Sequence, residues 1–172
     1  MPKILMIIAP ENFRDEEYFE PKKIFEEEGF SVATASTKTG EIKGMLGGIA
    51  KADLMIEDAR AEEYDAVLVV GGRGASVFFN DKKLHSLLQS FYKQGKLTTA
   101  ICVSPTTLAN AGLLEGKRAT VWADEELIEK LRDRGAKYTG LAITIDGQIV
   151  TANGPKAAKE FGREIVNILK GE

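Results

Sequence analysis

Three short runs of apolar residues constrain the fold of this chain most strongly. They are Lys3–Ala9, Ala66–Val70 and Leu97–Ile101. Runs this short that are apolar at nearly every position are typical of parallel strands covered on both faces. Amphipathic segments that end at a glycine separate them, as expected for helices. The alternation of strand and helix predicts a doubly wound α/β sandwich with a mostly parallel sheet.

The remaining segments extend this prediction. We expect Asp15 to cap the first helix, and Asp146-Gly147 to form the turn of a β-hairpin. Residues 37–64 look like an excursion of short β-like pieces, to which we assign no chemistry. Further helices are predicted over 15–29, 81–94, 104–112, 123–135 and 155–170, and further strands over 30–36, 52–57, 137–144 and 148–152, with another core strand in 113–122.

The only cysteine, Cys102, falls between a predicted strand and a predicted helix that starts at Ser104-Pro105. A sharp turn at this place holds a nucleophile in strained geometry above the sheet, as the G-x-S-x-G elbow of hydrolases does. A free cysteine is usually just a small buried hydrophobe, and composition alone favours that interpretation. The position reverses it, because a helix N-terminus lowers the pKa of a thiol. The sequence therefore predicts a reactive thiol.

Two other features should meet Cys102, because ligands of such sheets bind beyond the carboxyl ends of the strands. One is the loop after the first strand, with Glu17 at the start of the helix. The other is the Gly71-Gly72 turn, whose backbone N–H groups can face a ligand. Glycines often end strands for turning alone, and the spacing and lysine of nucleotide loops are missing. The convergence of the three features carries the prediction of a site.

Other chemistry-bearing residues have simpler interpretations. The only histidine, His85, lies within a predicted amphipathic helix, so we expect a surface or half-buried side chain and no catalytic role. Trp122 could line a pocket or fill the core, and core is the safer expectation. One histidine and one cysteine leave no zinc-type ligand cluster, so we expect no metal and no cofactor.

Composition bounds the remaining possibilities. A chain of 172 residues with 44% hydrophobic content suits one globular domain over 1–172. The net charge is −3 and no basic tract occurs, so nucleic acid is not an expected partner. The first apolar run is too short for a membrane span and is followed by acids, not by a cleavage site. We expect a cytoplasmic protein that binds no membrane.

The chain resembles the ThiJ/PfpI superfamily, which includes the PfpI intracellular peptidases and the parkinsonism-associated deglycase. The resemblance covers nearly the whole length and implies a flavodoxin-like fold, one ThiJ/PfpI-like domain and a homo-oligomer, a dimer or larger. Phe78-Phe79 could lie in such an interface, although core is the more usual place for them. The motifs on which the resemblance rests are Lys3–Ala9 with the acidic helix ending at Gly29, residues 64–72, Ala100-Ile-Cys102 with Pro105, and residues 108–117.

The resemblance also implies roles for individual residues. Glu17, four residues before Pro21, matches a family glutamate that hydrogen-bonds the thiol, here of Cys102. A carboxyl pressed against sulfur in a partly buried pocket should hold its proton and donate it. The N–H groups of Gly72 and Val103 match the donors to a developing oxyanion. We expect the pocket around them to include Gly71, Arg73 and Trp122.

The sequence departs from the family at the elbow. The PfpI-type peptidases have C-H-G-P there, with the histidine as general base, whereas this chain has Cys102-Val103-Ser104-Pro105. Valine cannot accept a proton, and loss of a base costs roughly 100- to 10,000-fold in rate. The peptidase interpretation is weakened. Ser104 in place of glycine and Val70 in place of proline are milder changes.

Four hypotheses follow. The first is an enzyme of the glyoxalase or deglycase kind, acting on small reactive carbonyls through Cys102 and Glu17, a chemistry that needs no imidazole. The second is a redox-responsive stress protein whose thiol oxidises to sulfenic and sulfinic acid. The third is a PfpI-type cysteine peptidase or amidase with a peptide substrate. The fourth is a member without catalysis, kept for binding or assembly.

Overall fold

A seven-stranded sheet forms the centre of the protein, and the predicted fold class is confirmed. The computed structural model describes all of residues 1–172. The strand order is β10-β11-β7-β6-β1-β2-β5, and every pairing is parallel except that of β10 with β11. The strands are β1 (Lys3–Ile7), β2 (Ser31–Ser36), β5 (Leu54–Met55), β6 (Ala66–Val69), β7 (Leu97–Ile101), β10 (Ile143–Asp146) and β11 (Ile149–Ala152).

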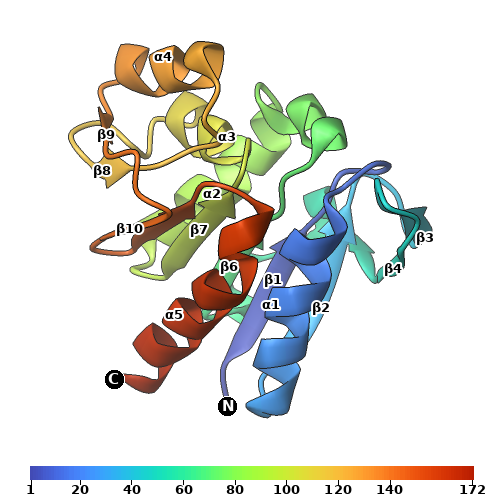
Figure 1. Cartoon of the computed structure of the whole chain (residues 1–172). Helices are drawn as coiled ribbons and strands as arrows, with labels where there is room; N and C mark the ends of the chain where they lie inside the picture. The colour runs from blue at the N-terminus through green and yellow to red at the C-terminus, as the bar shows by residue number, and fades with distance from the viewer.

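Helices cover both faces of the sheet, which explains why nearly every position of β1, β6 and β7 is buried (Figure 1). In β1, Leu5 and Ile7 belong to the core beneath α2 and α4, whereas Ile4 and Met6 belong to the core beneath α1 and α5. The helices are α1 (Asp15–Glu27), α2 (Lys82–Lys93), α3 (Pro105–Asn110), α4 (Glu125–Asp133) and α5 (Ala158–Lys170). None of them is long and apolar enough to traverse a lipid bilayer.

Helices α1 and α5 lie side by side on one face (Figure 1). Gly162 of α5 permits this approach, because a Cβ atom there would lie 3.1 Å from Cα of Pro21 in α1. The first turns of the two helices consequently border the same cleft, which adjoins the candidate site described below.

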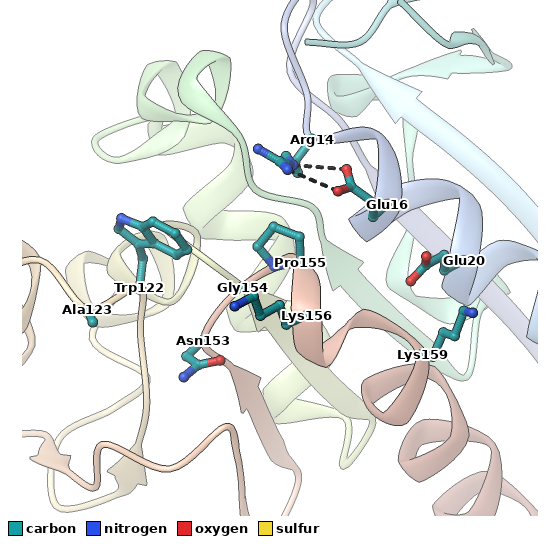
Figure 2. A pocket seen from close by; sticks show the side chains of 10 residues that line it. All are labelled: Arg14, Glu16, Glu20, Trp122, Ala123, Asn153, Gly154, Pro155, Lys156 and Lys159. Carbon is teal, nitrogen blue, oxygen red and sulfur yellow. Dashed lines mark hydrogen bonds and ion pairs between the residues drawn. The ribbon is translucent and has the colours of Figure 1, made fainter. Parts of the chain in front are cut away.

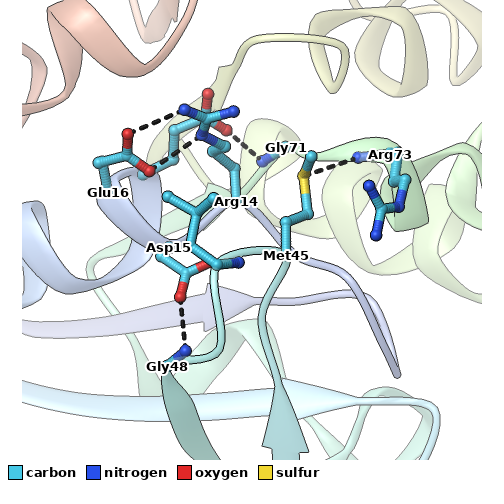
Figure 3. A network of polar contacts seen from close by, with 9 residues as sticks. Arg14, Asp15, Glu16, Met45, Gly48, Gly71 and Arg73 are labelled. Carbon is cyan, nitrogen blue, oxygen red and sulfur yellow. Dashed lines mark hydrogen bonds and ion pairs between the residues drawn. The ribbon is translucent and has the colours of Figure 1, made fainter.

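Asp15 does not have the predicted capping role. Helix α1 begins at Asp15 itself, and the preceding residue, Arg14, makes no side-chain cap. The Asp15 carboxylate accepts hydrogen bonds from the N–H groups of Leu46 at 2.8 Å and Gly48 at 2.7 Å (Figure 3). These two residues connect β3 (Gly40–Lys43) to β4 (Ile49–Ala52), which form a separate hairpin. Asp15 therefore fastens this hairpin to the start of α1.

Two predicted strands are largely wrong. Segment 113–122 contributes only β8 (Arg118–Ala119), which pairs with β9 (Lys137–Tyr138) outside the main sheet. The next N–H group, that of Thr120, donates to the side chain of Thr151, so no ladder with the main sheet forms. Segment 52–57 reduces to β5 and a 3-10 turn. The 3-10 helices are η1 (Ile56–Asp58), η2 (Ala61–Glu63), η3 (Arg73–Phe78) and η4 (Pro155–Ala157).

Candidate functional site

Cys102 stands in a sharp turn between β7 and α3. Its φ is +67°, a left-handed conformation that a non-glycine residue adopts at a cost in strain. Two backbone bonds hold it: its N–H donates to the carbonyl of Ala152 at 2.9 Å, and its carbonyl accepts from the N–H of Trp122 at 2.8 Å. The Ser104 hydroxyl donates to the carbonyl of Val70 at 2.8 Å. The elbow is thus bonded to β11, to the end of β6 and to the segment after β8.

Glu17 lies directly beside this elbow. Its side chain is fully buried, and Oε1 accepts from the Gly71 N–H at 3.0 Å. Its Oε2 makes no hydrogen bond, and Cys102 lies beside this carboxyl, next to Gly71. Gly71 lies between the Glu17 carboxyl and Cys102. A Cβ atom at this position would lie 2.6 Å from both Cβ of Cys102 and Oε1 of Glu17. Only a residue without a side chain fits between them.

Burial sets the protonation state of this pair. Desolvation raises the pKa of Glu17 from 4.5 to about 8, against hydrogen bonds with Cys102 and Gly71 that lower it. Glu17 therefore keeps its proton at neutral pH. Oε2 can then donate that proton to the sulfur.

The thiol pKa is shifted in the direction opposite to our prediction. Burial and the charge of Glu17 raise the pKa of Cys102 to about 12, although the N–H groups of Gly72 and Val103 lower it. The predicted lowering at a helix N-terminus is therefore wrong. The six-residue α3 supplies too little dipole to offset the removal of the sulfur from water, since Cys102 is only 7% exposed.

Two backbone N–H groups converge on the sulfur, those of Gly72 and Val103. Gly72 has a φ of +108°, and a Cβ atom there would collide with the backbone of Arg14, so no other residue can shape this loop in the same way. The structure thus brings together Cys102, Glu17, Gly72 and Val103. Their catalytic roles stay predictions.

A cleft of about 650 Å³ opens next to the elbow (Figure 2). Trp122 forms one end of it and is 46% exposed, so the expectation that this side chain fills the core is wrong. Three residues of the cleft wall lie close to the elbow through backbone bonds. The Trp122 N–H donates to the Cys102 carbonyl, Asn153 follows Ala152, which bonds Cys102, and the Arg14 N–H donates to the Gly71 carbonyl at 2.9 Å.

Sequence reasoning missed Arg14 and its partner Glu16. The guanidinium donates to both carboxylate oxygens of Glu16, with Nε–Oε1 and Nη2–Oε2 distances of 2.9 Å (Figure 3). This fork geometry holds Arg14 over the cleft. No motif marked it, because the pair depends on the turn that leads into α1.

Other predicted residues lie elsewhere. Arg73 is exposed, and its guanidinium donates to Asn12 at 3.3 Å instead of lining the cleft. His85 is buried in α2, not at the surface, and its Nε2 lies 2.9 Å from the carbonyl of Phe79. Phe78 fills the core, so it cannot contribute to an interface. No three His, Cys, Asp or Glu side chains gather closely enough to hold a metal ion.

Comparisons with known proteins agree with this architecture. A putative cysteine protease of Bacillus subtilis is 32% identical over 171 residues, covering 99% of this chain and 100% of that protein. A deglycase of Pyrococcus horikoshii is 30% identical over 168 residues, covering 98% and 99%. The crystal structure of a ThiJ/PfpI domain protein from Brachyspira murdochii superimposes with a TM-score of 0.95 at 35% identity, covering 99% and 97%. The family model described as DJ-1/PfpI family matches residues 2–168, and this chain belongs to that family.

Proposed function

We propose that this protein converts small reactive carbonyl compounds, in particular 2-oxoaldehydes, through covalent chemistry at Cys102. One observation carries the proposal: a carboxyl that keeps its proton, that of Glu17, and a thiol share a buried corner where two backbone N–H groups also converge. A nucleophile, an acid and oxyanion donors are the groups that carbonyl addition requires. The relatives named as deglycases support the same class of substrate.

The reactive form of the pair holds one proton, on Glu17. Sulfur forms a bond to the aldehyde carbon, the C=O electron pair moves to oxygen beside the Gly72 and Val103 N–H groups, and Glu17 protonates that oxygen. The Glu17 carboxylate then takes the hydrogen of the former aldehyde carbon as a proton and returns it to the adjacent carbon, while the hydroxyl proton of the former aldehyde oxygen passes to the former ketone oxygen. The resulting thioester is hydrolysed by water. The aldehyde carbon is oxidised and its neighbour reduced, so no external oxidant or cofactor is needed.

The peptidase interpretation has less support. A leaving amine needs a proton from a general acid such as histidine, whereas Val103 occupies the position next to Cys102. The only histidine, His85, is committed to the carbonyl of Phe79. The raised pKa of Cys102 does not separate the redox-sensor interpretation from carbonyl addition, because the thiolate is the nucleophile that attacks the peroxide in one case and the carbonyl in the other. Self-association stays a prediction from the family resemblance, and a cytoplasmic location stays a prediction from the composition.

Turnover of methylglyoxal to lactate tests the proposal. We expect activity in the wild type, none in Cys102→Ala, and at least a 100-fold loss in Glu17→Gln, which keeps the shape but cannot shuttle a proton. The kcat/KM should rise with pH up to about 8, because the singly protonated pair becomes populated as the second proton leaves. Equal rates in all three proteins would refute the assignment.

A further inference from the structure

The cleft beside Cys102 carries unpaired positive charge. Arg14 is neutralised by Glu16, but neither Lys156 nor Lys159 has a carboxylate within 4.0 Å, since the ion pairs of α5 use Arg163 and Lys170. The remaining acid of the cleft is Glu20. Cations therefore outnumber carboxylates here, in a chain whose net charge is −3.

The fold adds to this potential. Lys156 and Lys159 belong to the first turns at the N-terminal end of η4 and α5, where no side chain caps the helix. The turn η4 runs directly into the 13-residue helix α5, and the N-terminal end of the helix dipole contributes further positive charge. Glu16 also leaves Nη1 of Arg14 without a partner, on the side of the guanidinium away from the pair (Figure 2).

The positive groups lie beyond the elbow, not on it. The cleft extends from Trp122, whose N–H is bonded to Cys102, to Lys159 and Glu20 at its other end (Figure 2). A substrate whose carbonyl reaches the sulfur would lay its carbon chain along the indole ring of Trp122. Its far end would then meet the lysines.

We propose that the preferred substrates are 2-oxoaldehydes that carry an anionic group, a carboxylate or a phosphate, at the end opposite the aldehyde. Lys156, Lys159 and Nη1 of Arg14 bind this group and determine specificity. The inference rests on the proposed function and names its substrate class. A neutral compound such as methylglyoxal is then a poor substitute that uses only the elbow.

A matched pair of substrates tests this. The probe is 4,5-dioxopentanoate, which takes up water to give 2-hydroxyglutarate, and its neutral analogue is 2-oxopentanal, which gives 2-hydroxypentanoate. Both conversions are internal oxidation-reductions with no other reactant. We expect kcat/KM for the anionic probe to exceed that for the neutral one at least tenfold at low salt. The preference should shrink in 0.5 M NaCl, because salt screens exposed charges.

The double variant Lys156→Gln/Lys159→Gln should lose about five- to tenfold in kcat/KM for 4,5-dioxopentanoate and stay within twofold for 2-oxopentanal. Arg163→Gln is the matched control, since it removes a cation of the same helix that is paired with Glu160 outside the cleft. Competitive inhibition by glutarate or by inorganic phosphate shows which anion the cleft prefers.

The outcomes separate the two proposals. Equal turnover of both probes, unaffected by the lysine substitutions, overturns the anion site and leaves the carbonyl activity standing. The same holds if neither glutarate nor phosphate competes. Absence of turnover with every 2-oxoaldehyde overturns the proposed function and this inference with it.

Discussion

Replacing Glu17 with glutamine should make the protein more stable at neutral and alkaline pH. The folded protein holds the Glu17 proton with a pKa of about 8, whereas the unfolded chain releases it near 4.5. A carboxyl whose pKa is raised on folding contributes its full stability below pH 4.5, and this contribution is lost as the pH rises toward 8. Linkage gives a fall in unfolding free energy of about 3 to 4 kcal/mol between pH 5 and 8.

Glutamine cannot ionise, yet its carbonyl can still accept from the Gly71 N–H and its amide can face the sulfur. Urea unfolding of both proteins from pH 5 to 8 therefore measures the effect of Glu17 as a widening difference. His85, whose pKa burial lowers, titrates in both proteins and cancels. The raised pKa of Cys102 acts only above pH 9. Two stability curves that stay parallel across this range would refute the assignment of the buried proton.

Three further experiments test the elbow and its support. Gly71→Ala places a Cβ atom 2.6 Å from both Cys102 and Glu17. We therefore expect about 1 to 3 kcal/mol of destabilisation in urea unfolding and loss of carbonyl turnover. Full activity would contradict the close packing of Gly71 between these two residues. Alkylation of Cys102 by iodoacetamide should show a thiol pKa above that of a free thiol, about 8.5, and Glu17→Gln should lower it by removing the neighbouring charge; an ordinary value in both proteins would count against burial. Asp15→Ala should lower the free energy of unfolding by about 2 to 4 kcal/mol, because two hydrogen bonds from backbone N–H groups are lost. Asp15→Asn should lower it less. An unchanged urea midpoint would show that Asp15 does not fasten the β3–β4 hairpin.

Local sequence patterns predicted the sheet well. The bounds of β7 are those of the apolar and β-branched run Leu97–Ile101, because residues of these two kinds suit a strand that is buried on both faces. Asp146-Gly147 likewise gave the β10–β11 hairpin, since the left-handed φ of +60° at Gly147 suits the turn. The meeting of Glu17 with Cys102 followed from strand ends and family resemblance together.

Residues whose partners are distant in sequence could not be predicted in this way. Asp15 looked like a helix cap, but its partners, Leu46 and Gly48, lie in a hairpin about thirty residues away. Trp122 was expected in the core. The sequence does not show that its backbone N–H donates to the Cys102 carbonyl or that its indole ring lines the cleft. The predicted direction of the Cys102 pKa shift was wrong for a related reason, because the burial of the thiol depends on the whole fold.

The bond between the Cys102 N–H and Ala152 has a consequence for biosynthesis. Ala152 ends the last strand of the chain to be made, so a nascent polypeptide that stops short of it cannot close the turn around the sulfur. Until the ribosome has supplied that residue, the cysteine is an ordinary thiol in water. Completion of the protein raises the pKa of this thiol and should slow its labelling at neutral pH, so thiol labelling during translation would report how far maturation has advanced.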